Sequence, residues 1–170
     1  MKDNKESIAE EYIININDNF RRYKEMAEKA VEQVSEQDLH FRTDENQNSI
    51  AIIMQHIYGN LRSRFVDFYK SDGEKPNRDR DMEFEEQNLT REELLKNWNS
   101  SWEILLSLLS NLREDDLMKT VSIRGVNFTV IKVLERSLTH TTYHVGQIVQ
   151  LAKMIKKEEW QTLSIPKRKS

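Results

Sequence analysis

The 170-residue sequence contains no cysteine, only two prolines and only four glycines. The lack of cysteine excludes a disulfide, a thiolate metal ligand and a cysteine nucleophile, so any thiol chemistry requires a thiol from outside the chain. The scarcity of glycine and proline, together with 32% charged residues, favours long helices with exposed polar faces over a sheet-rich fold. The length suits one domain with a buried core, and we expect residues 1–170 to form a single domain.

The sequence also lacks an excess of basic residues and a long apolar run. Its formal net charge of −3 does not favour a nucleic-acid partner, since such proteins usually carry a basic face. The longest uncharged run, residues 137–152, is too short and too polar for a membrane span, which needs about 20 mostly apolar residues. The N-terminal residues lack the apolar core of a secretory signal. We therefore expect a cytoplasmic protein with neither a nucleic acid nor a membrane as partner.

Four segments have the spacing of apolar residues, three or four apart, that is typical of amphipathic helices. They cover about residues 7–34, 50–69, 90–112 and 129–156. The Ser/Thr-x-x-Glu spacing of a capping box opens the first helix at Ser7 and the third at Thr90. Ser49 and Thr129 are the expected N-caps of the other two helices. The apolar stripe predicted for the first helix begins at Ile8.

Two further segments interrupt the helical pattern. Residues 71–88 combine turn residues with a run of alternating charges and predict a long loop, which is either functional or a solvated connector. Residues 120–128 alternate apolar residues around Arg124-Gly125 and predict a small hairpin or two extended pieces. The predicted fold class is therefore all-α: an antiparallel four-helix bundle with a long crossover loop and a small extended segment before the last helix.

Three of the four histidines form the candidate chemical site. His140 and His144 are one helical turn apart, so both rings project from the same side of the last helix and could meet one metal ion. His56 lies between Ile53 and Ile57 of the apolar stripe in the second helix, so it is expected to face inward as a third ligand. The alternative is that all three are structural, because a single histidine on a helix is more often a packed side chain than a metal ligand.

Polar residues near these histidines are candidates to orient ligands or substrate: Asn60, Tyr143 and Gln147. Arg64 and the basic residues of the long loop could bind a carboxylate on a cosubstrate. The alternative, which the charge run favours, is surface pairing between those basic residues and acidic neighbours in the loop. The basic residues are Lys75, Arg78 and Arg80, and the acidic ones are Asp79, Asp81 and Glu83. The fourth histidine, His40, is interpreted as structural.

The segments that carry the histidines resemble the DinB/YfiT-like metal-binding helical bundles. The matching stretches are residues 54–60, which include His56, and residues 140–148, which contain His-x-x-x-His followed by Gly-Gln after one residue. The sequence is more similar still to an uncharacterised bacterial branch of that superfamily. This closer resemblance is carried by residues 48–51, 63–76 and 160–166, so it covers most of the chain.

The resemblance implies a four-helix bundle whose three histidines, His56, His140 and His144, bind a nickel- or zinc-like divalent cation, commonly in a homodimer. Characterised relatives include transferases and isomerases that use low-molecular-weight thiols such as glutathione, mycothiol or bacillithiol. We therefore expect a metal-dependent transferase that acts on a small-molecule substrate with a thiol cosubstrate. Two alternatives stay open: a metal-dependent hydrolase, in which water replaces the thiol, and a non-catalytic metal-binding or stress-associated interaction protein.

Overall fold

The computed structural model describes residues 7–165, most of which lie in four α-helices. These are α1 (Ile8–Glu32), α2 (Ile50–Phe65), α3 (Arg91–Ser110) and α4 (Val130–Lys156). A two-stranded antiparallel sheet of β1 (Thr120–Ile123) and β2 (Val126–Thr129) precedes α4. The predictions of four helices and of a small extended segment before the last helix are therefore confirmed. Pro166, the last residue of the tail motif, lies outside the described residues.

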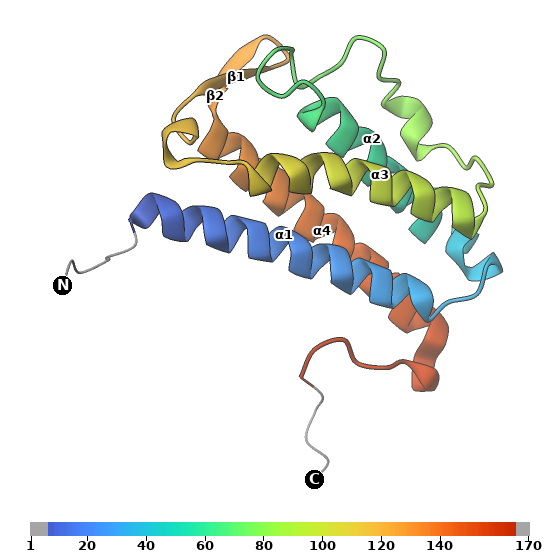
Figure 1. Ribbon diagram of the computed structural model, residues 1–170. Helices are drawn as coiled ribbons and strands as arrows, with labels where there is room; N and C mark the ends of the chain where they lie inside the picture. The colour runs from blue at the N-terminus through green and yellow to red at the C-terminus, as the bar shows by residue number, and fades with distance from the viewer. Residues whose placement is uncertain (1–6, 166–170) are drawn as a thin grey trace.

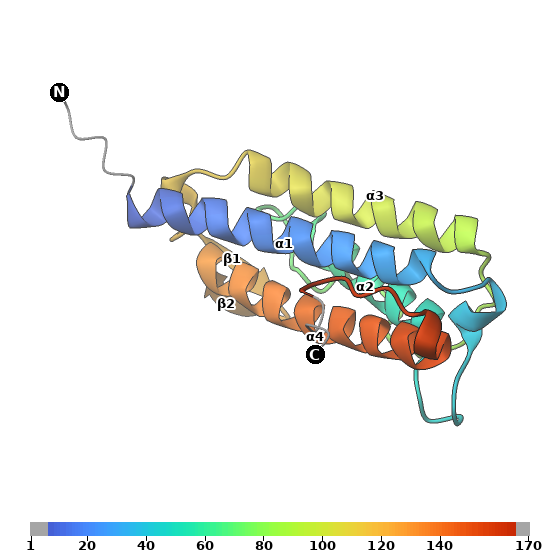
Figure 2. The same ribbon diagram turned by 90° about the horizontal axis from the view of Figure 1, so that it is seen from below.

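The helices lie side by side in two pairs, α1 with α4 and α2 with α3 (Figures 1 and 2). The helices of the first pair run in the same direction, because the Tyr12 hydroxyl donates to the Ile131 carbonyl at one end and Gln33 bonds to Gln161 at the other. The second pair runs the opposite way, so α1 is antiparallel to α3 and α2 is antiparallel to α4. The predicted antiparallel bundle with a long crossover loop thus has two helix directions, each shared by one pair.

The shared direction of α2 and α3 is a consequence of the long connection between them. Residues 66–90 carry the chain back along the length of the helices before α3 begins, and they include the short 3-10 helix η2 (Asp81–Phe84) (Figure 1). This crossing segment contains the predicted long loop, residues 71–88. It starts earlier, at Val66, because α2 ends at Phe65 and not at about residue 69 as the periodicity indicated. It lies over α2, and this position brings part of its charge run against the second helix.

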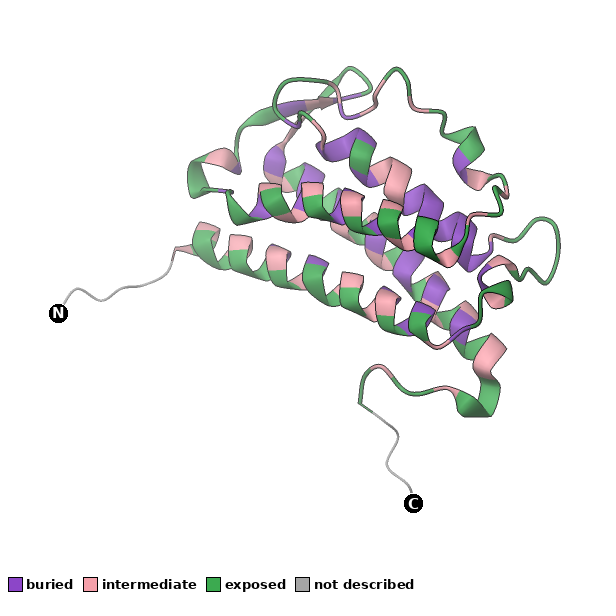
Figure 3. Cartoon of the chain, turned by 45° about the vertical axis from the view of Figure 1, so that its right-hand side comes forward, coloured by how far each residue is buried: buried purple, intermediate pink, exposed green. Residues whose placement is uncertain are grey.

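The core lies between the helices, whose inward faces are buried while their outer faces are exposed (Figure 3). Trp98 and Trp102 of α3 are fully buried, with ring centroids 5.3 Å apart. Ile8 departs from the predicted stripe of α1, since 93% of its surface is exposed. It is the first residue of α1, which starts beyond the neighbouring helices at that end (Figure 1).

Three of the four expected helix caps are present. Ser7 and Thr90 form capping boxes with Glu10 and Glu93, and the Ser49 hydroxyl accepts a hydrogen bond from a backbone N–H of α2. Thr129 precedes α4, but its side chain makes no capping hydrogen bond, and its buried hydroxyl has no partner among residues 7–165. Polar capping thus sets three helix starts, while the start of α4 depends on its packing and on the preceding strand.

The β1–β2 hairpin is tied to the crossing segment through one carboxylate. Asp72 accepts hydrogen bonds from the Ser122 hydroxyl at 2.5 Å and from the backbone N–H groups of Arg124 and Gly125 at 2.7 and 2.8 Å. Arg124 and Gly125 both have positive φ, as a tight two-residue hairpin turn requires. The contact holds the turn, and with it the Arg124 side chain, close to the start of the crossing segment. Within residues 7–165, no helix combines the length and the apolar character that a membrane crossing demands.

A pair of isoleucines on α1 tests which face of this helix is packed. Ile16 is 2% exposed, whereas Ile14 is 47% exposed. Ile16→Ala is expected to lower the free energy of unfolding by about 2–5 kcal/mol, because it removes buried methyl groups and leaves a cavity. Ile14→Ala, the matched control, is expected to change it by no more than about 0.5 kcal/mol. Urea denaturation of both variants measures the difference, and equal losses would contradict the assigned face.

Candidate metal centre

The structure brings together the three histidines singled out from the sequence. His56 projects from α2, and His140 and His144 project from α4, the antiparallel neighbour of α2. The candidate ligand atoms of the three side chains all lie within 4.8 Å of one another. Their ring centroids are 4.6 to 5.1 Å apart. His56 and His144 are buried and His140 is half-buried, so the cluster lies at the boundary between core and solvent.

The distances within the cluster fit a shared metal ion. The Nε2 atoms of His56 and His140 are 3.1 Å apart. Two nitrogens that each bind one zinc ion at about 2.0–2.1 Å are separated by about 3 Å, so these two atoms already have the spacing of ligands. The same distance also suits a hydrogen bond between the rings, and the position of the ring protons decides between the two. For neutral His56 and His144, the group bonded to Nδ1 shows which ring nitrogen carries the proton.

Glu83 determines the protonation of His56. Its Oε2 atom lies 2.9 Å from Nδ1 of His56, and a carboxylate in this position accepts the Nδ1 proton and leaves Nε2 as a free lone pair. Burial by itself raises the pKa of Glu83, but hydrogen bonds from His56 and Arg78 outweigh it and hold the pKa below the usual range. The carboxylate comes this close because residue 59 is glycine: a Cβ there would be 2.0 Å from Glu83 Oε1.

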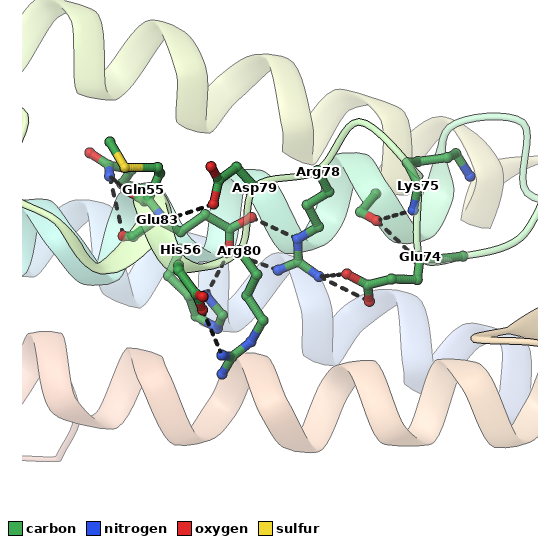
Figure 4. A network of polar contacts seen from close by, with 12 residues as sticks. Gln55, His56, Glu74, Lys75, Arg78, Asp79, Arg80 and Glu83 are labelled. Atoms are coloured by element: carbon green, nitrogen blue, oxygen red, sulfur yellow. Dashed lines mark hydrogen bonds and ion pairs between the residues drawn. The ribbon is translucent and has the colours of Figure 1, made fainter.

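Arg78 holds Glu83 in place from the other side. Its guanidinium donates to both carboxylate oxygens of Glu83 at 2.7 Å and also contacts Glu74, so it lies between the two acids (Figure 4). The Arg78 and Glu83 side chains are only 6% and 9% exposed. The expected pairing of Arg78 with the acidic residues of the loop is therefore present as Arg78–Glu83, but the ion pair is buried and two-point instead of lying at the surface. Lys75, by contrast, points away from the histidines and donates to the Asp72 carbonyl.

His144 has its own orienting partner in Gln147. The Nδ1–H group of His144 donates to the amide oxygen of Gln147 at 2.9 Å, so the Nε2 lone pair of His144 is also free to bind a ligand. Gln147 is one of the three residues named as candidates to orient a ligand, and its partner in the structure is His144. Tyr143 is 64% exposed and packs its ring beside that of His144, at a centroid separation of 5.0 Å. Asn60 lines a cavity next to His56 and His140.

The environment keeps the α4 histidines neutral at neutral pH. Burial, with His144 and His56 close by, lowers the pKa of His140 to about 3. Burial and His56 also lower the pKa of His144, although the hydrogen bond to Gln147 opposes the change. Neutral imidazole is the form that binds a metal ion, so neither His140 nor His144 has to lose a proton near pH 7 before an ion can bind.

Glu83 is the functional candidate that the sequence prediction missed, because it lies inside a run of charges that looked solvated. The sequence nevertheless contained a signal for this position at the next residue, Phe84. Phe84 is one of the few apolar residues in that run, and its ring packs against His56 at a centroid distance of 4.5 Å. An aromatic residue in a charged loop indicates that the loop folds inward at that point, and Phe84 takes Glu83 to the histidines with it.

A known protein family matches the region of the chain that contains the site. The family model described as "Protein of unknown function (DUF1572)" matches residues 7–169. The matched region includes every residue of the histidine cluster and both orienting partners, Glu83 and Gln147. No curated protein matches the chain. The family match thus covers the whole described fold and names no reaction.

The lowered pKa of His140 predicts how the metal-free protein responds to acid. In the unfolded chain His140 binds a proton below about pH 6.5, whereas in the folded protein it does so only near its pKa of about 3. Between these pH values the proton therefore favours the unfolded chain, and the stability of the folded protein falls as the pH falls. We expect the chelator-treated protein to lose about 1 kcal/mol from this residue between about pH 7 and pH 5, after allowance for its partial exposure. Urea denaturation at both pH values measures it. His140→Gln should show a weaker pH dependence than the wild type, and an equal dependence in the two proteins contradicts the assignment.

Proposed function

The chain belongs to the DUF1572 family, and we propose that it is a metal-dependent enzyme whose divalent ion, zinc or nickel, is held by His56, His140 and His144. One observation carries the proposal: the Nδ1 atoms of His56 and His144 are occupied by Glu83 and Gln147. This leaves the Nε2 lone pairs of both rings available in one cluster with His140. Histidines that bind metals typically have such a partner on the second ring nitrogen.

The four-helix arrangement and the position of the histidines on α2 and α4 support the resemblance to the DinB/YfiT-like bundles. If the histidine cluster is the metal site, the crossing segment is part of that site, because it supplies Glu83 and Arg78. We propose that their function in this chain is to hold His56 in one tautomer and one orientation. Arg78 keeps Glu83 ionised, and ionised Glu83 keeps the proton on Nδ1 of His56.

Three neutral imidazoles leave an ion its full charge, and an ion bound in this way supplies Lewis acidity that lowers the pKa of a thiol or a water. The cluster within residues 7–165 comprises three histidines and no fourth ligand, which favours a site with an open position over a closed structural one. The half-buried position of His140 gives a small molecule access to that open position.

The reaction we favour is transfer of a low-molecular-weight thiol to a small-molecule substrate. The chain has no cysteine, so the nucleophilic sulfur is supplied by the cosubstrate. The polar cavity beside His56 and His140 also favours a second candidate, metal-dependent hydrolysis, because a small polar space suits water. Product formation without added thiol separates hydrolysis from thiol transfer.

Metal analysis of untagged protein tests the proposed centre. The wild type, after incubation with zinc or nickel, is expected to retain about one equivalent of metal per chain, since three converging imidazoles make one site. His144→Ala is expected to lose it. His40→Ala is the control, because His40 pairs with Glu86 outside the cluster and its loss should leave the metal content unchanged. A folded wild type that takes up neither metal refutes the enzyme proposal.

The role of Glu83 is tested separately by charge removal. Glu83→Gln is expected to weaken metal affinity about 10- to 100-fold, because it removes the anion that orients His56 and supports its basicity. Glu85→Gln is the matched control: Glu85 is two residues away and exposed. Competition titration with a chromogenic chelator measures both affinities, and circular dichroism verifies folding. Equal affinities for the two variants would contradict a role for Glu83 beyond surface charge.

A further inference from the structure

A cavity of about 210 Å³ adjoins the histidine cluster, and arginines dominate its walls. His56 and His140 form one side of it. The arginines that line it are Arg64, Arg78, Arg80, Arg124 and Arg136, and Glu74 is the one carboxylate among its lining residues in the described part of the chain. The cavity is smaller than the roughly 300–1,000 Å³ of sites that enclose a whole drug-sized ligand, so its size suits a single small polar group.

The cavity follows from the way α2 and α4 face each other. His56, Asn60 and Arg64 are successive members of an i, i+4 row on α2, and Arg136, His140 and His144 form such a row on α4. Because the two helices are antiparallel neighbours, the histidine ends of the rows meet and so do the arginine ends. Each row therefore joins the metal-binding cluster to an arginine one or two turns away.

Part of the positive charge in this cavity has no carboxylate partner within residues 7–165. Arg78 is satisfied by Glu74 and Glu83, and Arg124 contacts Glu74 at 3.3 Å. Arg80 has a single ion pair, 3.9 Å from Asp81, whose side chain is 98% exposed. In the described part of the chain, Arg64 and Arg136 have no ion pair. Arg64 and Arg136 thus face a shared polar space without an ion-pair partner in residues 7–165, and Arg80 has only the distant, exposed carboxylate of Asp81.

Arg64 is the most informative of the three because it is buried. Only 7% of its surface is exposed, and its Nη1 atom is buried without a hydrogen-bond partner in residues 7–165. Burial, with Arg136 close by, lowers the pKa of Arg64 to about 10, so the guanidinium stays charged at neutral pH in a place that disfavours its charge. A buried charge of this kind is costly unless a counter-charge and hydrogen bonds compensate it.

We propose that the arginine cavity binds the anionic group of the substrate or cosubstrate, a carboxylate or a phosphate, and so orients that molecule toward the histidine cluster. The planar guanidinium groups match the paired oxygens of either anion, and a bound anion would give Arg64 the direct ion pair that it does not make within residues 7–165, where Glu74 acts on it only from a distance. This inference rests on the proposed function for its purpose, but the anion site itself can be tested without any metal.

Calorimetric titration with inorganic phosphate and, separately, with succinate tests the site on both chelator-treated and zinc-loaded protein. The wild type without metal is expected to bind one of the two probes saturably. Arg136→Gln, an exposed substitution that should not disturb folding, is expected to weaken that binding about tenfold or more, because it removes a charge-assisted hydrogen bond. Arg62→Gln is the matched control, since Arg62 is an exposed arginine of α2 that does not line this cavity.

Thermal unfolding gives a second measurement, on Arg64→Gln. Removal of an uncompensated buried charge is expected to leave the melting temperature unchanged or higher without the anion, and to abolish the increase that the anion produces in the wild type.

Failure of both probes to bind, or equal weakening by Arg62→Gln and Arg136→Gln, overturns the inference. Metal uptake without anion binding refutes this inference alone, whereas anion binding without metal uptake refutes the metal centre alone. Whichever probe binds identifies the anion as phosphate or carboxylate.

Discussion

The hydrogen bond between Glu83 and Nδ1 of His56 is the interaction on which the site depends. It joins the crossing segment to α2, and it determines which nitrogen of His56 carries a proton. Without the carboxylate, either tautomer of His56 could form, and the lone pair at Nε2 would not be assured. Arg78 stabilises the carboxylate in turn, so a segment that resembles a solvated loop in composition holds a buried three-residue chain of charge and hydrogen bonds.

The direction of the helices decides which side chains meet. Residues 66–90 return the chain to the end of the molecule where α2 began, so α3 runs parallel to α2. The antiparallel neighbour of α2 is therefore α4. That geometry aligns the i, i+4 row of His56 with the row of His140 along their whole length. The histidines and the arginines are therefore parts of one continuous polar seam within a helical protein whose other contacts are mostly apolar.

The two ends of this seam influence each other through charge. The pKa of His140 is lowered first by burial and by the other two histidines, and Arg78 and Arg64 lower it further. The arginines thus help to keep His140 neutral, as metal binding requires, but they also oppose a second cation nearby. An anion in the arginine cavity would remove that opposition. The proposed binding of a metal and of an anion is therefore expected to be mutually favourable.

Local patterns in the sequence predicted the four helices, the three clustered histidines and an extended segment before the last helix, because periodicity, caps and one-turn spacing report directly on which residues share a face. They left open whether that segment is a hairpin or two separate pieces. It also indicated Gln147, which is one turn from His144 on the same helix. The burial of Glu83 and Arg78, the exposure of Ile8 and the approach of Arg64 to Arg136 follow only from the packed structure. They depend on where separate segments lie relative to one another, and no local pattern in the chain records the distance between segments that are far apart in sequence.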